Sequence, residues 1–512
     1  MTDYSGVLVA NPLPWDRTIS GPVSKYAVNA RGRPDDELSA RHWQDRAFND
    51  DTYLLPRTEV PGNGYTVVPV GELLSNEGWP SDERRTVETD AFRITFDRER
   101  GGIAGWWDKH LGCEWVDETA EYPLAGVVRE RLADENHEAP RDRLFRAPEA
   151  GDANPNGLWN AAPGLVEDRE SESWESPRLG YQPDWRAERY GPERVTAHHV
   201  YRTPLGYDVR QSLTVSGLDS AVDLRVFVPD EGRNVVVEAT WVEGRSTHPS
   251  STYLAFPLSL SDPEAHVDVG GQAMRPGRDQ LSGCNRDFYT VQRWTELSND
   301  ERGMTVGCPL NPLVQFGDFH FGENREEFAL DRALVLGWVA TNYYNTNFRA
   351  HQPGVVRARY HLRPHEGSFD EARAHRAGAE ADHWGVLAQP LAEGGASPRF
   401  PRSGRWFDLP DPPVLVLFVR PAGRADAFLD PDAVADETTL DGQVEVGLLN
   451  ASDDARTATV ASGVLEITGA RAVGVLGEEM DGPALDVDDD CVVVDIDPRT
   501  LRVVRLSFGG RT

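Results

Sequence analysis

Short stretches that alternate apolar and polar residues recur along most of the chain and predict β-strands. Residues 91–96 alternate in this way, and a Gly101-Gly102 turn leads into residues 103–107 as the second strand of a hairpin. Further stretches of strand length, bounded by turn-forming residues, lie at 7–10, 65–70, 222–228, 235–241, 414–419 and 443–449. A large antiparallel sandwich accommodates so many strands, so we predict an all-β fold.

One segment predicts a helix. Ser368 and Glu371 have the spacing of a capping box, and an Ala-rich segment follows them. We therefore expect a single connecting helix near residues 369–388.

Loop-like composition divides the chain into three expected domains. Residues 71–85 and 389–413 are rich in Pro, Gly or charged residues and resemble linkers. We expect a small β domain at 1–80, a large β supersandwich at 86–388 and a C-terminal β-sandwich at 412–509. A long loop-rich excursion at 131–195 interrupts the second domain and is either a functional or a mobile loop.

The composition favours a folded protein and argues against nucleic acid as a partner. The 512 residues include 14 Trp, 14 Tyr and 18 Phe, enough apolar side chains to form real cores. Acidic residues outnumber basic ones by 84 to 52, which gives a net charge of −32. Nucleic acid and anionic membrane surfaces both require basic surfaces, and the sequence has no basic stripe.

The basic residues are nearly all arginine, since Lys25 and Lys109 are the only lysines. Few lysines and many acids favour a halophilic origin, because salt screens the repulsion while the charge keeps the protein soluble; arginine-rich codon usage is the alternative. The four cysteines lie far apart, so we expect reduced thiols. Without a signal peptide or a membrane-spanning run, the chain is expected to be soluble and cytoplasmic.

No catalytic or metal-binding motif stands out. The sequence lacks a Walker loop, a GxGxxG turn, an HExxH motif and a GxSxG elbow. His266 and Asp268 share one face of a predicted strand, but no second ligand pair lies at a suitable spacing. A glycosidase needs two facing carboxylates, and spacing does not single out two of the 84 acids. We predict no catalytic residue and no metal ligand in this chain.

Two stretches, residues 279–294 and 338–348, mix aromatic rings with Asn, Asp, Gln or Arg. Sugar recognition needs this mixture, because a ring stacks on the apolar face of a sugar while forked polar groups bond its hydroxyls. The open alternative is that the rings fill the core from loops and strand ends. The candidate substrate-binding residues are Asp287, Tyr289, Gln292, Arg293, Trp294, Asn342, Tyr343 and Asn347.

Motifs spread over nearly the whole chain resemble the β-domain half of glycoside hydrolase family 38, the α-mannosidases. Residues 9–17 are similar to the strand that opens the first β domain of the family, and residues 89–96 with 101–103 to the start of its large sandwich. Similar matches to the late sandwich and the terminal β domain lie at 292–294, 312–318, 342–348, 446–450 and 501–506. The motifs follow the domain order of the family.

The resemblance implies a galactose-mutarotase-like supersandwich that forms part of the rim of a mannose pocket. It places the nucleophile and most of the zinc site of the family on an N-terminal catalytic barrel, whose motifs have no match in this chain. We therefore expect no cofactor in this chain, zinc only in a partner catalytic barrel, and mannosides as ligands. The stretches 279–294 and 338–348 are the candidates for the rim.

Four roles stay open at this point. The chain could be the β-domain subunit of a split α-mannosidase, with an exposed apolar patch where a separately encoded catalytic barrel docks. It could be a stand-alone carbohydrate-binding protein, or a gene fragment. It could also be an independent enzyme with a His and a carboxylate converging on a mutarotase-like sandwich. Fold alone does not choose between these roles.

Overall fold

The computed structural model describes residues 6–24, 52–75, 78–132, 187–246, 250–321, 325–342, 353–390, 401–422, 443–463, 465–480, 482 and 484–509. These residues form antiparallel sheets and one α-helix, which confirms the all-β prediction. The chain forms two compact units: Met1–Trp79, Gly270–Ala273 and Glu371–Thr512 make up unit 1, and Pro80–Val269 with Met274–Asp370 make up unit 2. The three-domain boundaries stay a prediction.

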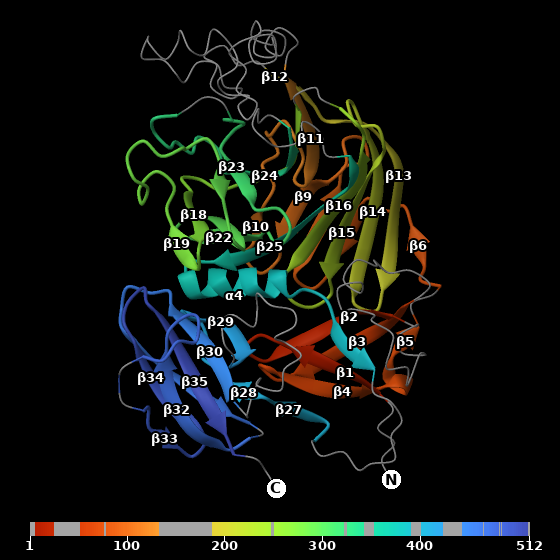
Figure 1. Ribbon diagram of the computed structural model, residues 1–512. Coiled ribbons are helices and arrows are strands. Elements are labelled where there is room, and N and C mark those ends of the chain that lie inside the picture. Colours follow the sequence, from red (N-terminus) through yellow and green to blue (C-terminus); the bar gives the residue numbers. More distant parts are fainter. Residues whose placement is uncertain are drawn as a thin grey trace, which may run out of the picture. The chain divides into compact units, whose positions relative to one another are not determined.

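Unit 2 contains two large antiparallel sheets, except that residues 272 and 273 of one edge strand belong to unit 1 (Figure 1). In spatial order, the six-stranded sheet consists of β12 (Ala187–Tyr190), β11 (Gly126–Leu132), β17 (Ser250–Pro257), β24 (Leu334–Thr341), β23 (Leu313–Phe316) and β20 (Tyr289–Thr290). The ten-stranded sheet consists of β19 (Gln272–Met274), β18 (Glu264–Val269), β21 (Trp294–Ser298), β22 (Arg302–Gly307), β25 (Gly354–Glu366), β16 (Val235–Glu243), β15 (Val222–Pro229), β14 (Gly206–Val215), β13 (Pro192–Thr203) and β6 (Ser81–Asp82).

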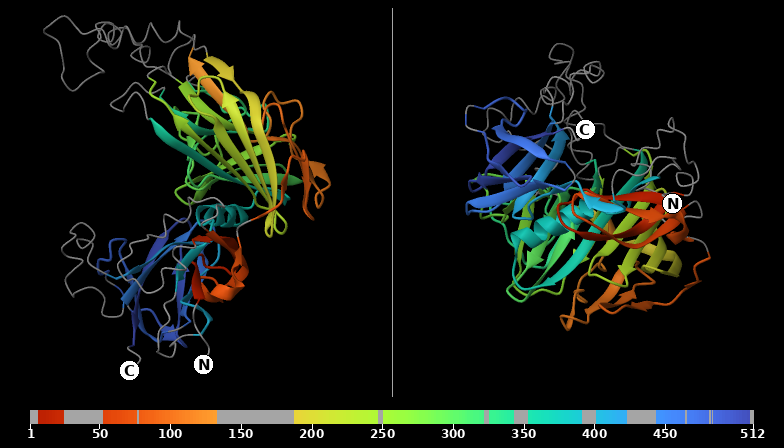
Figure 2. Two further views of the ribbon diagram at one scale, coloured as in Figure 1. Left: turned by 90° about the vertical axis from the view of Figure 1, so that its right-hand side faces the viewer. Right: turned by 90° about the horizontal axis from the view of Figure 1, so that it is seen from below.

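The inner faces of the two sheets share one hydrophobic core. Leu254 and Phe256 of the six-stranded sheet belong to the same buried cluster as Leu224 and Val237 of the ten-stranded sheet. In β15, fully buried residues alternate with more exposed ones, as the sequence pattern predicts. Figure 2 gives two further views of the ten-stranded sheet, whose strands β13 to β16 run side by side.

A smaller sheet adds to this core and contains the predicted hairpin. It consists of β10 (Cys113–Glu114), β9 (Ile103–Asp108), β8 (Phe92–Phe96) and β7 (Thr86–Glu88), so the hairpin prediction is confirmed as β8 and β9. Gly101 and Gly102 have φ angles of 75° and 78°, a conformation that favours glycine. Most of the predicted excursion at 131–195 lies outside the described residues, and β13 begins at Pro192.

Unit 1 contains four sheets around two cores. In the N-terminal pair, the first sheet consists of β26 (Leu387–Pro390), β1 (Gly6–Asn11), β4 (Gly64–Pro69) and β27 (Ser403–Arg405). The second sheet of this pair consists of β2 (Arg17–Ser24), β3 (Thr52–Val60) and β5 (Leu74–Ser75). In the C-terminal pair, one sheet consists of β28 (Phe407–Asp408), β31 (Arg456–Ser462), β34 (Cys491–Ile496) and β33 (Val487–Asp488). The other sheet consists of β29 (Val414–Pro421), β30 (Gln443–Asn450), β35 (Leu501–Phe508) and β32 (Ile467–Val473). A short 3₁₀ helix spans Val70–Glu72.

Two of the motifs that suggested the family, at residues 9–17 and 446–450, contain an asparagine with the same role. Asn11 accepts a hydrogen bond from the Leu13 backbone N–H and donates to the carbonyls of Trp15, Val60 and Pro61. Asn450 repeats this pattern with the Ser452 N–H and the carbonyls of residues 454, 496 and 497. Each buried amide satisfies the backbone of a turn that follows a central strand.

The helix α4 (Glu371–Asp382) is shorter than predicted. Its first helical residue is Glu371, and the segment that follows Gly385, whose φ is 108°, continues as strand β26. The helical pattern therefore stops early because residues 387–390 pair with residues 7–10 of β1. An available strand edge outweighs the helix propensity of an Ala-rich segment.

Candidate functional site

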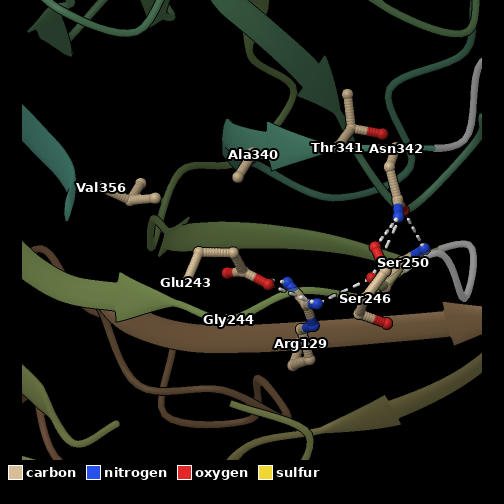
Figure 3. Close-up of a pocket in the computed structure, with 9 residues that line it drawn as sticks. All are labelled: Arg129, Glu243, Gly244, Ser246, Ser250, Ala340, Thr341, Asn342 and Val356. Atoms are coloured by element: carbon tan, nitrogen blue, oxygen red, sulfur yellow. Dashed lines mark hydrogen bonds and ion pairs between the residues drawn. The ribbon is translucent and has the colours of Figure 1, made fainter. Parts of the chain in front are cut away.

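A polar hollow opens between the two large sheets of unit 2, at the end where β16 and β24 finish (Figure 3). The space between its lining residues, counted together with the open solvent at its mouth, is about 390 Å³. The residues that line it are Arg129, Glu243, Gly244, Ser246, Ser250, Ala340, Thr341, Asn342 and Val356. It joins residues of β11, β17 and β24 in one sheet to residues of β16 and β25 in the other.

Arg129 is fixed in place by four side-chain hydrogen bonds. Its Nη2 donates to Glu243 Oε1 at 2.9 Å and to Ser250 Oγ at 2.7 Å. Its Nη1 donates to Thr252 Oγ1 at 2.6 Å and to Glu243 Oε2 at 3.4 Å. Because Arg129 belongs to the six-stranded sheet and Glu243 to the ten-stranded sheet, this ion pair also connects the sheets.

Asn342 holds the neighbouring side of the hollow together. Its Oδ1 accepts a hydrogen bond from the Ser250 backbone N–H at 2.6 Å, and its Nδ2 donates to the Ser246 carbonyl at 3.4 Å. Figure 3 shows its amide directed toward these two serines. Asn342 therefore fixes the end of β24 to the start of β17.

The hollow offers carboxylate, hydroxyl and amide groups next to a small apolar surface. Ala340 and Val356 line it opposite the ion pair, while Glu243, Ser250 and Thr341 supply oxygen atoms (Figure 3). Such a surface matches a ligand with several hydroxyl groups and an apolar ring face. Of the predicted site residues, Asn342 is half-buried and lines this hollow.

Sequence reasoning missed Arg129 and Glu243, although the strand pattern contains a signal for both. Val127 faces the core of the six-stranded sheet, so Arg129, two residues later, lies on the same inner face. Glu243 continues the inner row of Val237 and Trp241 in β16. A charge on a core-facing row requires a buried partner, and two such rows of opposite charge predict an ion pair.

Three other predicted site residues are buried and expose almost no surface. Asp287 is 3%, Tyr289 5% and Trp294 0% exposed. The Asp287 carboxylate accepts a hydrogen bond from the Arg325 N–H at 3.0 Å, and burial raises the pKa of Tyr289 to about 12. The Trp294 ring lies 5.8 Å from the ring of Phe369. None of these rings has a face free to stack on a sugar in this structure.

The stretch 279–294 instead covers a buried group of rings on the outer face of the six-stranded sheet. Phe288 packs against Trp338 of β24, with ring centroids 5.4 Å apart, and Trp338 stacks on Tyr253 of β17 at 5.7 Å. We call the following residues the aromatic cluster: Tyr122, Tyr253, Phe288, Phe319, Phe321 and Trp338. The predicted stretches meet here through Phe288 and Trp338, and this packing agrees with the alternative that the rings fill a core.

The remaining predicted residues differ in their surroundings. Gln292 is exposed, and its backbone N–H donates a hydrogen bond to the carbonyl of Asp268. Arg293 is half-buried, and its backbone carbonyl accepts a hydrogen bond from the N–H of Cys308. Tyr343 and Asn347 lie outside the described residues. A sugar-binding role for these four residues stays a prediction.

The other face of the ten-stranded sheet contains a histidine close to a carboxylate. His365 Nε2 lies 3.0 Å from Glu296 Oε1, and Thr305 Oγ1 donates to Glu296 Oε2 at 2.6 Å. The two ionisable residues are only 8% and 0% exposed. The pair therefore presents almost no surface to a substrate, which weakens the interpretation as an independent mutarotase-like enzyme.

His266, from the His-x-Asp pattern, stacks flat on Phe369 with ring centroids 3.7 Å apart. Burial holds its pKa below the usual range. Within the described ranges, no three His, Cys, Asp or Glu residues gather as metal ligands would. No helix found in those ranges has both the length and the apolar character needed to cross a bilayer.

Comparison with solved structures reveals a fold relationship that sequence comparison does not. No family model matches the chain, and a search of curated proteins found no match. An α-mannosidase from Enterococcus faecalis V583 is similar to this chain with a TM-score of 0.56 and 12% sequence identity. The match covers 98% of this chain and 57% of the α-mannosidase chain. A glycosyl hydrolase family 38 protein from Enterococcus faecalis also has a TM-score of 0.56, at 10% identity, covering 99% of this chain and 58% of its own.

These comparisons establish a shared fold. The chain spans less than two thirds of the length of both solved proteins. A galactose mutarotase related enzyme from Lactobacillus acidophilus is a more distant match, with a TM-score of 0.28 and 9% identity, covering 56% of this chain and 98% of its own.

Proposed function

We propose that this chain is the β-domain portion of an α-mannosidase-like glycoside hydrolase. In this proposal, the hollow around Asn342 and Glu243 contributes to the mannoside pocket, and the chain docks on a separately encoded catalytic barrel that supplies the nucleophile and the zinc. The proposal is carried by the fold match, which covers 98% of this chain but 57% of an α-mannosidase.

The character of the hollow supports a hydroxyl-rich ligand. Glu243, Ser250, Thr341 and Asn342 place oxygen and amide groups around a small apolar surface. Sugar hydroxyls both donate and accept hydrogen bonds, so one ring can use the carboxylate, the hydroxyls and the amide together. The partner barrel would contribute the groups that break the glycosidic bond, since we assign no catalytic residue to this chain.

The test is hydrolysis of an aryl α-mannoside by the full chain, alone and mixed with a chain that carries a candidate family 38 barrel. We expect activity only in the mixture, and a stable complex in size-exclusion chromatography. Turnover by the purified chain alone at an ordinary enzymatic rate would contradict the proposal. Absence of a complex with every barrel tested would also count against it.

A stand-alone carbohydrate-binding protein is the second candidate, because the described residues that line the hollow all belong to unit 2. Its test is saturable binding of mannose oligosaccharides by the chain alone, measured by calorimetry. Asn342→Ala should abolish that binding if the hollow is the site. Loss on Gln292→Ala instead would move the site to the 279–294 stretch.

A further inference from the structure

Two of the residues that line the hollow have charged side chains, and they neutralise each other. Arg129 and Glu243 form an ion pair with an Nη2 to Oε1 distance of 2.9 Å. The other lining residues among those described are glycine, alanine, valine, serine, threonine and asparagine. The described residues that line the hollow therefore carry no net charge together, within a protein whose net charge is −32.

The ion pair is buried enough for its charges to matter. The Arg129 side chain is 5% exposed and that of Glu243 is 15% exposed. The Trp241 indole N–H also donates to Glu243 Oε2 at 2.9 Å, so the carboxylate is fixed from both sides. Away from bulk water, charge interactions weaken less with distance than they do at an exposed surface.

A ligand that carries a carboxylate or phosphate would encounter opposing forces in this hollow. Arg129 attracts the anion, but the Glu243 carboxylate paired with it repels the anion, so little net attraction remains. The anion would still lose its hydration, which is costly for a charged group without a partner. A neutral sugar avoids this cost because its hydroxyls can donate to Glu243 and to the neighbouring side-chain oxygens.

We propose that Glu243 sets the charge selectivity of the hollow: by pairing with Arg129, it makes the site accept uncharged, hydroxyl-rich sugars and exclude carboxylated or phosphorylated ones. The inference rests on the proposed function for the identity of the sugar. The charge balance of the hollow is a property of this chain alone and can be tested without a catalytic barrel.

The first test uses the full chain and two probes of similar size, methyl α-mannoside and its uronic acid. In the wild type, the neutral probe should bind at least about tenfold more tightly than the acid. Glu243→Gln retains the size of the side chain but removes its charge, leaving Arg129 uncompensated. This variant should bind the acid at least about tenfold more tightly than the wild type does, the scale expected for one unscreened charge.

A second variant tests the same principle without breaking the ion pair. Ser246 is exposed at the mouth of the hollow, so Ser246→Lys should fold normally and should also increase binding of the acid. The double variant Arg129→Met/Glu243→Gln should lose the gain of the single Glu243→Gln variant. Circular dichroism and thermal unfolding establish whether each variant is folded. If Glu243→Gln does not fold, the result for Ser246→Lys decides the test.

The inference is overturned if folded Glu243→Gln and Ser246→Lys bind the acid no better than the wild type, or if the wild type binds the acid as tightly as it binds the neutral probe. It is also overturned if the double variant retains the gain, because Arg129 would then not be its source. Failure of the proposed function looks different: the wild type binds neither probe, while Glu243→Gln still gains affinity for the acid. That outcome supports charge control by Glu243 and removes the mannoside assignment.

Discussion

The aromatic cluster and the hollow both contain residues of strands β17 and β24, but the two regions differ in character. In β24, Trp338 points to the outer face of the six-stranded sheet and stacks on Tyr253, whereas Ala340 and Thr341 at the end of the strand line the hollow. In β17, Tyr253 belongs to the aromatic cluster, while the preceding residue, Thr252, binds Arg129. The first region encloses its rings, whereas the second places polar groups around a partly open hollow.

This difference teaches that residue type alone does not identify a binding surface. The stretch 279–294 has the composition of a sugar-binding loop, but Phe288 and Tyr289 pack against other aromatic rings. None of the described residues that line the hollow is aromatic, and the Arg129–Glu243 ion pair lies on one side of it. Access to solvent, which depends on which face of a strand is covered, distinguishes the two regions.

The largest expected effect is a loss of folding stability when a buried aromatic side chain is removed. Trp294 is completely buried against Phe369, so Trp294→Ala should lower the free energy of unfolding by about 3–5 kcal/mol. Chemical denaturation measures this change. Trp107, which is 39% exposed, provides the matched control, and Trp107→Ala should cost clearly less. Similar effects of the two substitutions would contradict the assigned burial.

Breaking the ion pair in the hollow should have the next largest effect. Arg129→Met leaves the Glu243 carboxylate partly buried without its cation and removes hydrogen bonds to Ser250 and Thr252. We expect a loss of about 3 kcal/mol in urea unfolding experiments. The double variant Arg129→Met/Glu243→Leu should recover part of that loss, because no charge is then left unpaired. A single variant as stable as the wild type would contradict a stabilising role of the ion pair.

A smaller effect is expected at Asn342. Asn342→Ala removes the acceptor for the Ser250 N–H and the donor to the Ser246 carbonyl, at a cost of about 1–2 kcal/mol. Asn342→Asp keeps the acceptor and should cost less stability. Mannoside binding, followed by calorimetry, should fall much more in Asn342→Ala than in Gln292→Ala. The reverse order would place the sugar site in the 279–294 stretch.

The smallest expected effect is a loss of stability at acid pH, caused by the buried side chain of His266. Burial lowers the pKa of His266 in the folded protein below its unfolded value, although Glu264 and Glu296 partly oppose this shift. The unfolded chain therefore binds the proton first, and stability should decrease as the pH falls from about 6.5 toward the folded pKa. Comparing pH-dependent unfolding of the wild type with His266→Gln measures this contribution. An identical pH dependence in both proteins would contradict it.

The alternation of apolar and polar residues was enough to predict an all-β chain and the positions of many strands. The strands at 222–228 and 235–241 were predicted because a strand with one face in the core must place an apolar residue at every second position. The hairpin at Gly101 and Gly102 followed from the same local rule together with the backbone freedom of glycine. Such features depend on neighbours in the sequence.

Tertiary structure alone decided which polar and aromatic residues reach solvent. The strand at 387–390 formed because β1 offered a pairing edge more than 370 residues away in the sequence, and the Arg129–Glu243 pair joins positions from two different sheets. Trp294 and Asn342 both belonged to promising stretches, yet one is enclosed and the other lines a hollow. Burial depends on long-range packing of one strand face against distant segments, and the local pattern of residues does not contain that information.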